Sequence, residues 1–137
     1  MKQIIKKITF KTKPFQIINI TQNINEILNK SNVRQGLINL SILHTSCSLM
    51  IQENADNSVM LDIKDFLDKI APEKEYYHNS EGPDDMPAHL KSLLTQTNLT
   101  ISVRKNILIL GTWQGIFLLE HRNASKQREV FFHLIGE

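Results

Sequence analysis

Cysteine is nearly absent from this 137-residue sequence, which contains only Cys47. A single cysteine excludes a disulfide framework and the paired-cysteine motifs of zinc and redox proteins. Long apolar runs are missing as well: the longest, such as 107–110 and 116–119, have four residues, so we expect no membrane span. Lysines interrupt the apolar residues near the N-terminus, where a signal peptide would need an apolar block, and we therefore expect a cytoplasmic protein.

Neither sign of charge is in clear excess. The 16 Lys+Arg and 14 Asp+Glu give a net charge of +2, which does not indicate a nucleic-acid-binding protein. The distribution is uneven, because residues 53–85 hold ten acids and only three lysines, whereas both flanks are basic. An acidic middle suits a cation site, and basic flanks would attract a phosphorylated small molecule. Most of these charges, such as Asp62, Asp65 and Lys69 on one helical face, are interpreted as solvated surface.

The order of the predicted elements favours one α+β domain over residues 1–137, a mainly antiparallel β-sheet sandwich with about three helices. Thr21 is the expected N-cap of the first helix, Asn54 or Asp56 caps a second that Pro72 ends, and Asp85 or Met86 caps a third, short helix up to residue 94. Strands are expected at 2–10, 15–20, 37–44, 48–52, 99–104, 107–110, 116–122 and 129–135.

Two of the last strands carry consecutive apolar residues, at 116–119 and 130–132. Side chains that point to opposite faces of the sheet are then both apolar, so both faces must be covered. Helices can cover only part of that surface in so small a domain. A homo-oligomeric interface is therefore a reasonable inference.

The segment HNSEGPDDMPAH at 78–89 carries the clearest chemical signal. Imidazole nitrogens and carboxylate oxygens are the ligands that Zn²⁺ and Mn²⁺ use, while the prolines and Gly82 shape a loop on which they can converge. His89 is expected in the first turn of its helix, where the helix dipole favours a neutral imidazole. His44, at the end of a predicted central strand, would complete a three-histidine site with one open position. A polar loop with exposed histidines, and a buried structural His44, are the alternatives.

Other candidates allow two interpretations each. Cys47 is more typical of a small buried residue than of a nucleophile. Trp113 either lines a pocket or caps the core, with the core favoured. Glu120 and Arg122, on one face of a predicted strand, form a salt bridge or part of a site. His121 and His133 lie outside these clusters and are interpreted as structural.

The succession HTSCS (44–48), QENAD (52–56), YHNSEGPDDMPAHLK (77–91), GTWQGI (111–116), LEHR (119–122) and LIGE (134–137) resembles the YjbQ family, also called UPF0047 and described as secondary thiamine-phosphate synthases. The resemblance implies an α+β homotrimer with a cleft of acids and histidines near subunit boundaries. It also implies the joining of a hydroxymethylpyrimidine diphosphate to a thiazole phosphate with release of pyrophosphate. Cys47 is the main departure, since relatives often have a small apolar residue there.

Carried over position by position, the resemblance places metal ligands at His44, His78 and His89. Its remaining site positions are Glu53, Asp56, Asn79, Glu81, Asp85, Trp113, Gln114, Glu120 and Arg122. Among these, we expect catalytic roles for Glu53, Glu81, Asp85, Glu120 and Arg122, and substrate binding by Asn79, Trp113 and Gln114.

Three functions follow as hypotheses. In each, the cofactor is a divalent metal (Zn, Mn or Mg), and the expected partner is a small phosphorylated metabolite. The first is the thiamine-phosphate synthase reaction, with Arg122 holding a phosphate. The second is a metal-dependent hydrolase in which Glu81 or Glu53 takes the proton from metal-bound water, because three histidines suit a transition metal that acidifies water. The third is a non-enzymatic trimer that binds a metal or metabolite.

Overall fold

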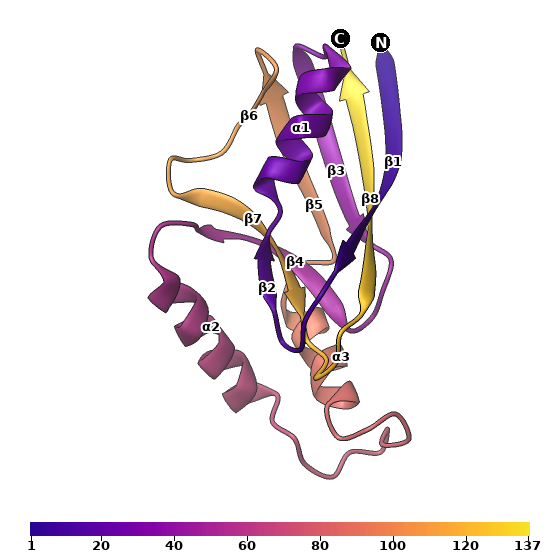
Figure 1. Cartoon of the computed structure of the whole chain (residues 1–137), viewed down its shortest axis with the longest axis vertical. Coiled ribbons are helices and arrows are strands. Elements are labelled where there is room, and N and C mark those ends of the chain that lie inside the picture. Colours follow the sequence, from indigo (N-terminus) through magenta and orange to yellow (C-terminus); the bar gives the residue numbers. More distant parts are fainter.

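The computed structural model describes residues 1–137 as two antiparallel sheets with three helices (Figure 1). The larger sheet has the strand order β1-β8-β3-β5-β6 and the smaller one the order β2-β7-β4. The strands are β1 (Lys2–Lys11), β2 (Ile17–Asn19), β3 (Gln35–Ile42), β4 (Cys47–Glu53), β5 (Asn98–Arg104), β6 (Ile107–Leu108), β7 (Gln114–Glu120) and β8 (Gln127–Gly136). The helices are α1 (Thr21–Ser31), α2 (Asn57–Ile70) and α3 (Asp85–Leu94). The predicted α+β class, the antiparallel pairing and the three helices are confirmed.

The main core lies between the two sheets. Alternate residues of the central strand β3, Ile38 and Leu40, are fully buried in it, and α1 adds Ile24 and Leu28. The larger sheet turns its other face outward, and there the paired residues Leu37 and Ile135 are 46% and 38% exposed. The period-two pattern of β3 therefore decides which of its residues reach the core.

Strand β7 is apolar on both faces because both faces are covered within one chain. Ile116 and Leu118 belong to the main core, whereas Phe117 and Leu119 form a second cluster with Leu67 of α2. The run of apolar residues at 116–119 thus has an explanation that requires no partner subunit. Exposed apolar side chains occur instead on the outer face of the larger sheet, as Ile5, Leu37 and Ile135, and also on the helices, as Leu61, Phe66 and Leu93.

Helix starts differ from the sequence expectation where a side chain finds a distant partner. Thr21 is the first helical residue of α1 and not its cap: its hydroxyl donates to Asn19 Oδ1 (2.7 Å) and accepts from the Ile116 amide (2.9 Å). Helix α2 is capped as one of the two alternatives predicted, with Asp56 accepting from the Ser58 amide at 2.9 Å.

Helix α3 begins earlier than either predicted cap, Asp85 or Met86, would place it: Asp84 is at the cap position, so Asp85 lies in the first turn and His89 lies beyond it. The helix dipole therefore does not favour a neutral imidazole at His89, because its effect decays within the first turn. Strands β3 and β7 end at Ile42 and Glu120, so His44 and Arg122 lie in the loops that follow. Trp113 is 63% exposed, and its predicted core position is wrong.

The segment between α2 and α3 runs along the end of the molecule opposite to the two termini (Figure 1). It brings residues 71–84 beside the loops that follow β3 and β7. None of the three helices is long and apolar enough to cross a membrane.

Candidate metal centre

Two imidazoles and one carboxylate converge where this segment enters α3. The Nε2 atoms of His78 and His89 lie 2.7 and 3.1 Å from the same oxygen, Asp85 Oδ2. The donor atoms of the three residues all lie within 4.8 Å of one another. His89 and Asp85 share a face of α3 because they are four residues apart, and the preceding loop supplies His78.

Hydrogen bonding fixes the tautomer of His89. Its Nδ1 lies 2.8 Å from the carbonyl oxygen of Thr45, which can only accept, so Nδ1 carries the proton. In a neutral His89 the lone pair of Nε2 then faces the carboxylate of Asp85. Two acceptors 3.1 Å apart need a cation or a second proton between them. A histidine that donates its other N–H to a backbone carbonyl is also the usual arrangement of a metal ligand.

Arg122 holds the other side of Asp85. Its Nη1 donates to Asp85 Oδ1 at 2.7 Å, its Nε donates to Asp84 Oδ2 at 2.9 Å, and its Nη2 donates to the Glu81 carbonyl at 2.8 Å. Burial alone would raise the pKa of Asp85, but the His78 hydrogen bond and the nearby charges of His89 and Arg122 hold it below its usual value. Asp85 is only 4% exposed and stays ionised, with Oδ2 directed at the two imidazoles.

His44 is not part of this cluster. Its Nε2 accepts a hydrogen bond from the Glu129 amide at 2.8 Å, so in the neutral ring the proton is on Nδ1 and the lone pair is already used. Burial, together with the charge of Arg128, lowers the pKa of His44. The structure therefore combines two of the three predicted histidines, and Asp85 supplies the third donor.

The chemistry of these donors fits a transition metal. Two imidazole nitrogens with one carboxylate oxygen form the ligand set of several catalytic zinc and non-haem iron sites, and three protein ligands leave positions open. His78, whose side chain is 45% exposed, forms the open side of the cluster. A magnesium ion, which prefers oxygen ligands, fits less well.

Comparison with known proteins finds relatives that match this chain in sequence and in fold. The family model described as UPF0047 protein YjbQ-like matches residues 6–137. The chain is 46% identical to UPF0047 protein sll1880 of Synechocystis over 87% of this chain and 82% of that one. It is 41% identical to UPF0047 protein YjbQ of Salmonella typhimurium over 96% and 97%. The chain belongs to the UPF0047 YjbQ-like family.

Solved structures of the same family superpose closely on this UPF0047 chain. An uncharacterized conserved YjbQ/UPF0047 protein from Clostridium acetobutylicum has a TM-score of 0.88 at 34% identity, covering 95% of this chain and 99% of that one. The conserved hypothetical protein TT1486 from Thermus thermophilus has a TM-score of 0.84 at 34% identity, with the same coverage. These names state no activity.

In this UPF0047 chain, Glu120 is a buried carboxylate that is hydrogen-bonded to residues outside the metal centre. The expected side-chain pair with Arg122 is absent: Glu120 is 2% exposed and forms two hydrogen bonds with Arg128, while Thr12 Oγ1 donates to it at 2.6 Å. These bonds outweigh burial and lower the pKa of Glu120. Only the backbone amide of Arg122 reaches it, at 3.1 Å.

Several other predicted site residues lie at the far end of the smaller sheet. Glu53 pairs with Gln114 at one end of the β4–β7 ladder, whereas Cys47 pairs with Glu120 at the other end, about 20 Å away along the strand. Trp113 precedes this far end and Asp56 caps α2 beside it. Glu53 Oε2 is fully buried without a hydrogen-bond partner. Asn79 and Glu81, in contrast, lie in the exposed loop that carries His78.

The sequence gives no indication of a role for Arg128, and His121 is interpreted there as structural. Arg128, the partner of Glu120, lies in a strand whose residues alternate between buried and partly or fully exposed. Nothing in the sequence around Arg128 indicates that it belongs to a buried ion pair. His121 is buried beside α3, and its adjacency to Arg122 was the only available hint. Cys47 is buried as predicted, and burial raises the pKa of its thiol to about 12, which excludes a reactive thiolate.

Proposed function

We propose that this chain is a metal-dependent hydrolase whose metal is held by His78, Asp85 and His89. The observation that carries the proposal is the shared oxygen of Asp85, which both Nε2 atoms approach while Nδ1 of His89 is committed to the Thr45 carbonyl. When bound, an ion such as Zn²⁺ or Mn²⁺ supplies Lewis acidity, which makes water acidic near neutral pH and polarises an ester or phosphoryl oxygen.

The chain's own residues divide the remaining tasks. Arg122 positions Asp85 and, through the Glu81 carbonyl, the loop that carries Glu81. Three of the five N–H groups of Arg122 are engaged with Asp84, Asp85 and Glu81, so two remain for a substrate phosphate. The exposed carboxylate of Glu81 is the candidate general base, because Glu81 belongs to the loop that carries His78, whereas Glu53 lies at the end of β4 opposite to Cys47.

The thiamine-phosphate synthase reaction is a second candidate. Three protein donors leave several coordination positions open, and two adjacent oxygens of a diphosphate could occupy them. Only the two remaining N–H groups of Arg122 are available for its predicted role as the phosphate holder in that reaction. A phosphorylated small molecule is the proposed substrate in both cases.

Turnover assays separate the candidates. We expect hydrolysis of 4-nitrophenyl esters or phosphodiesters on addition of Zn²⁺ or Mn²⁺, with a loss of at least about a hundredfold in His89→Ala. His44→Ala is the matched control, since His44 lies outside the cluster and its Nε2 accepts from the Glu129 amide at 2.8 Å. Formation of thiamine phosphate from the two precursors without hydrolysis would favour the second candidate. Metal binding without either reaction would leave a non-enzymatic binding protein.

We also propose that the chain assembles as a homotrimer. Two features support the proposal: the uncovered apolar side chains Ile5, Leu37 and Ile135 on one sheet face, and the separation of Glu53, Trp113 and Gln114 from the histidines of the same chain. In an oligomer, the far end of one subunit's smaller sheet can lie beside the metal centre of another.

A further inference from the structure

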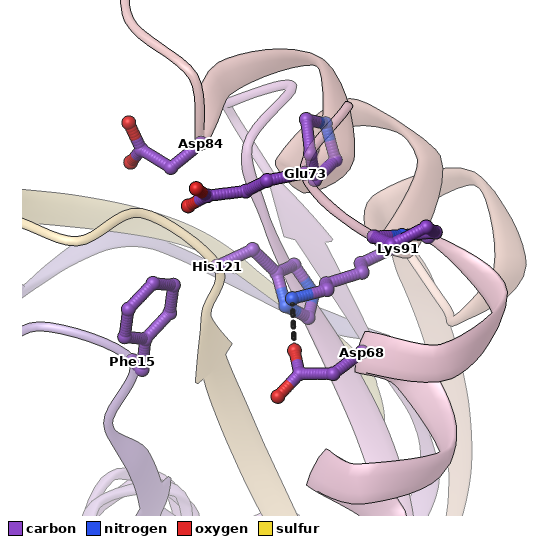
Figure 2. Close-up of a pocket in the computed structure, with 9 residues that line it drawn as sticks. Phe15, Asp68, Glu73, Asp84, Lys91 and His121 are labelled. Atoms are coloured by element: carbon purple, nitrogen blue, oxygen red, sulfur yellow. Dashed lines mark hydrogen bonds and ion pairs between the residues drawn. The ribbon is translucent and has the colours of Figure 1, made fainter. Parts of the chain in front are cut away.

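A cavity of about 330 Å³ lies between the C-terminal end of α2, the middle of α3 and the loop before β2 (Figure 2). Asp68 and Glu73 line one side of the cavity. Asp84, just before α3, and Lys91, within α3, line another. Phe15 and His121 complete the wall. None of the three proposed metal ligands lines it. Its volume is at the lower end of the range for small-molecule sites.

His121 lines this cavity and has one ring nitrogen without a partner. The residue is 4% exposed, and burial lowers the pKa of its ring to about 4, so the imidazole is neutral at neutral pH. Its Nε2 lies 2.8 Å from Ser48 Oγ, and Nδ1 has no partner within the chain. Nδ1 is not sealed off, because Glu53 Oε2 is the one fully buried side-chain polar atom without a partner.

A chain of hydroxyl groups decides which nitrogen of His121 carries the proton. The Lys91 carbonyl can only accept, so the hydroxyl of Thr95 donates to it at 2.7 Å. Ser48 must then donate its own proton to Thr95 Oγ1, at 2.6 Å, and accept from His121. Nε2 is therefore the protonated nitrogen, and Nδ1 is an acceptor on the cavity wall.

Apart from the ammonium of Lys91, the other charged groups that line the cavity are carboxylates, which accept hydrogen bonds. Lys91 Nζ, the ammonium in the wall, donates to Asp68 Oδ1 at 2.6 Å and leaves Oδ2 free. Asp84 uses Oδ2 for Arg122 and for the Asn123 amide, at 2.9 and 2.8 Å. Glu73 makes no hydrogen bond at all. Three carboxylates against one ammonium give the lining a net negative charge.

We propose that this cavity binds a small organic cation with several N–H groups, such as an amidinium or a protonated amine. The His121 lone pair and the free carboxylate oxygens would accept its N–H groups. The ring of Phe15, which has Lys91 Nζ 5.6 Å and Lys64 Nζ 5.9 Å from its centroid, would contact the apolar part of the ligand. A single metal ion is a poorer match, because the only set of three His, Cys, Asp or Glu donors within 4.8 Å of one another is the cluster of His78, Asp85 and His89.

Titration with benzamidine, followed by ¹⁵N NMR of the histidine rings, tests this proposal. We expect saturable binding, a shift of the His121 Nδ1 resonance, and at least about tenfold weaker binding of benzamide, which has the same shape without the charge. Glu73→Gln should weaken benzamidine binding by about threefold to tenfold. Glu75→Gln is the matched control, since Glu75 lies two residues away and does not line the cavity.

The proposal is overturned by any of three results: no saturable benzamidine binding, equal binding of benzamide, or an equal loss in the two glutamine variants. Both substituted glutamates are exposed, so neither variant threatens the fold. The test needs no metal and no turnover, so its outcome is independent of the metal centre.

Discussion

At the scale of single residues, Glu120 and Arg128 place a pair of charges inside the protein. Their side chains are 0% and 6% exposed, and Arg128 also donates to the Ser46 hydroxyl and carbonyl at 3.0 and 3.2 Å. Removal of one partner from such a pair leaves an uncompensated buried charge. Glu120 therefore matters for stability whatever its part in the chemistry.

We predict that Glu120→Ala lowers the free energy of unfolding by about 3–5 kcal/mol. Glu129→Ala should cost less than about 1 kcal/mol, because Glu129 meets Lys7 in an exposed pair at 3.5 Å. Urea denaturation of both variants measures the difference. Equal losses would contradict the assignment of Glu120 as a buried structural carboxylate.

His121 makes stability depend on pH. The pKa of its ring falls from 6.5 to about 4 on folding, because burial disfavours the charged form. Below pH 6.5 the unfolded chain takes up a proton that the folded chain refuses, so stability rises with pH between about 4 and 6.5. Between neutral pH and about pH 4, this effect lowers the free energy of unfolding by on the order of 3 kcal/mol.

The matching variant is His121→Phe, which should flatten the decline in unfolding free energy between pH 6.5 and 4.5. Urea denaturation at several pH values measures that slope, and His133→Phe is the control. An unchanged slope in His121→Phe would mean that His121 is not a neutral buried ring.

The candidate site was predictable from sequence only where its donors are neighbours along the chain. His78, Asp85 and His89 lie within twelve residues, and a loop followed by a helix suffices to bring them together. His44 was different, because the Glu129 amide that uses its lone pair is 85 residues away. His121 was interpreted as structural, but its surroundings could not be predicted, since they depend on Ser48 and α3.

At the scale of elements, strands were easier to predict than helix ends. In β3 the alternation of Ile38, Leu40 and Ile42 with polar residues assigns each side chain to a face locally. The start of α1 instead depends on Thr21, whose hydroxyl is engaged by Ile116 of β7. Tertiary hydrogen bonds of this kind leave no local signal in the sequence.

Helix α2 is attached to the smaller sheet through one small apolar cluster. Leu67 is the only buried residue of the helix and belongs to one cluster with Met50, Phe117 and Leu119. We predict that Leu67→Ala costs about 2–5 kcal/mol of unfolding free energy. Leu61→Ala, at a position 64% exposed, should change it by less than about 0.5 kcal/mol. Thermal or urea denaturation distinguishes these values, and a small effect of Leu67→Ala would refute the packing described.

At the scale of the whole molecule, the homotrimer makes a prediction about mass. Light scattering should give about three times the chain mass of 15.8 kDa. Leu37→Asp, on the outer face of the larger sheet, should shift the protein towards the monomer, because it places a charge among uncovered apolar side chains. Leu61→Asp, on α2, should not. A monomeric native protein at micromolar concentration would rule out the trimer.

Metal content tests the central claim most directly. Elemental analysis after loading with Zn²⁺ should find about one ion per chain in the native protein and in His44→Ala. It should find almost none in His78→Ala, Asp85→Ala or His89→Ala, because each removes one of three donors around a single point. Full metal content in Asp85→Ala and His89→Ala, or a loss as complete in His44→Ala, would contradict the account.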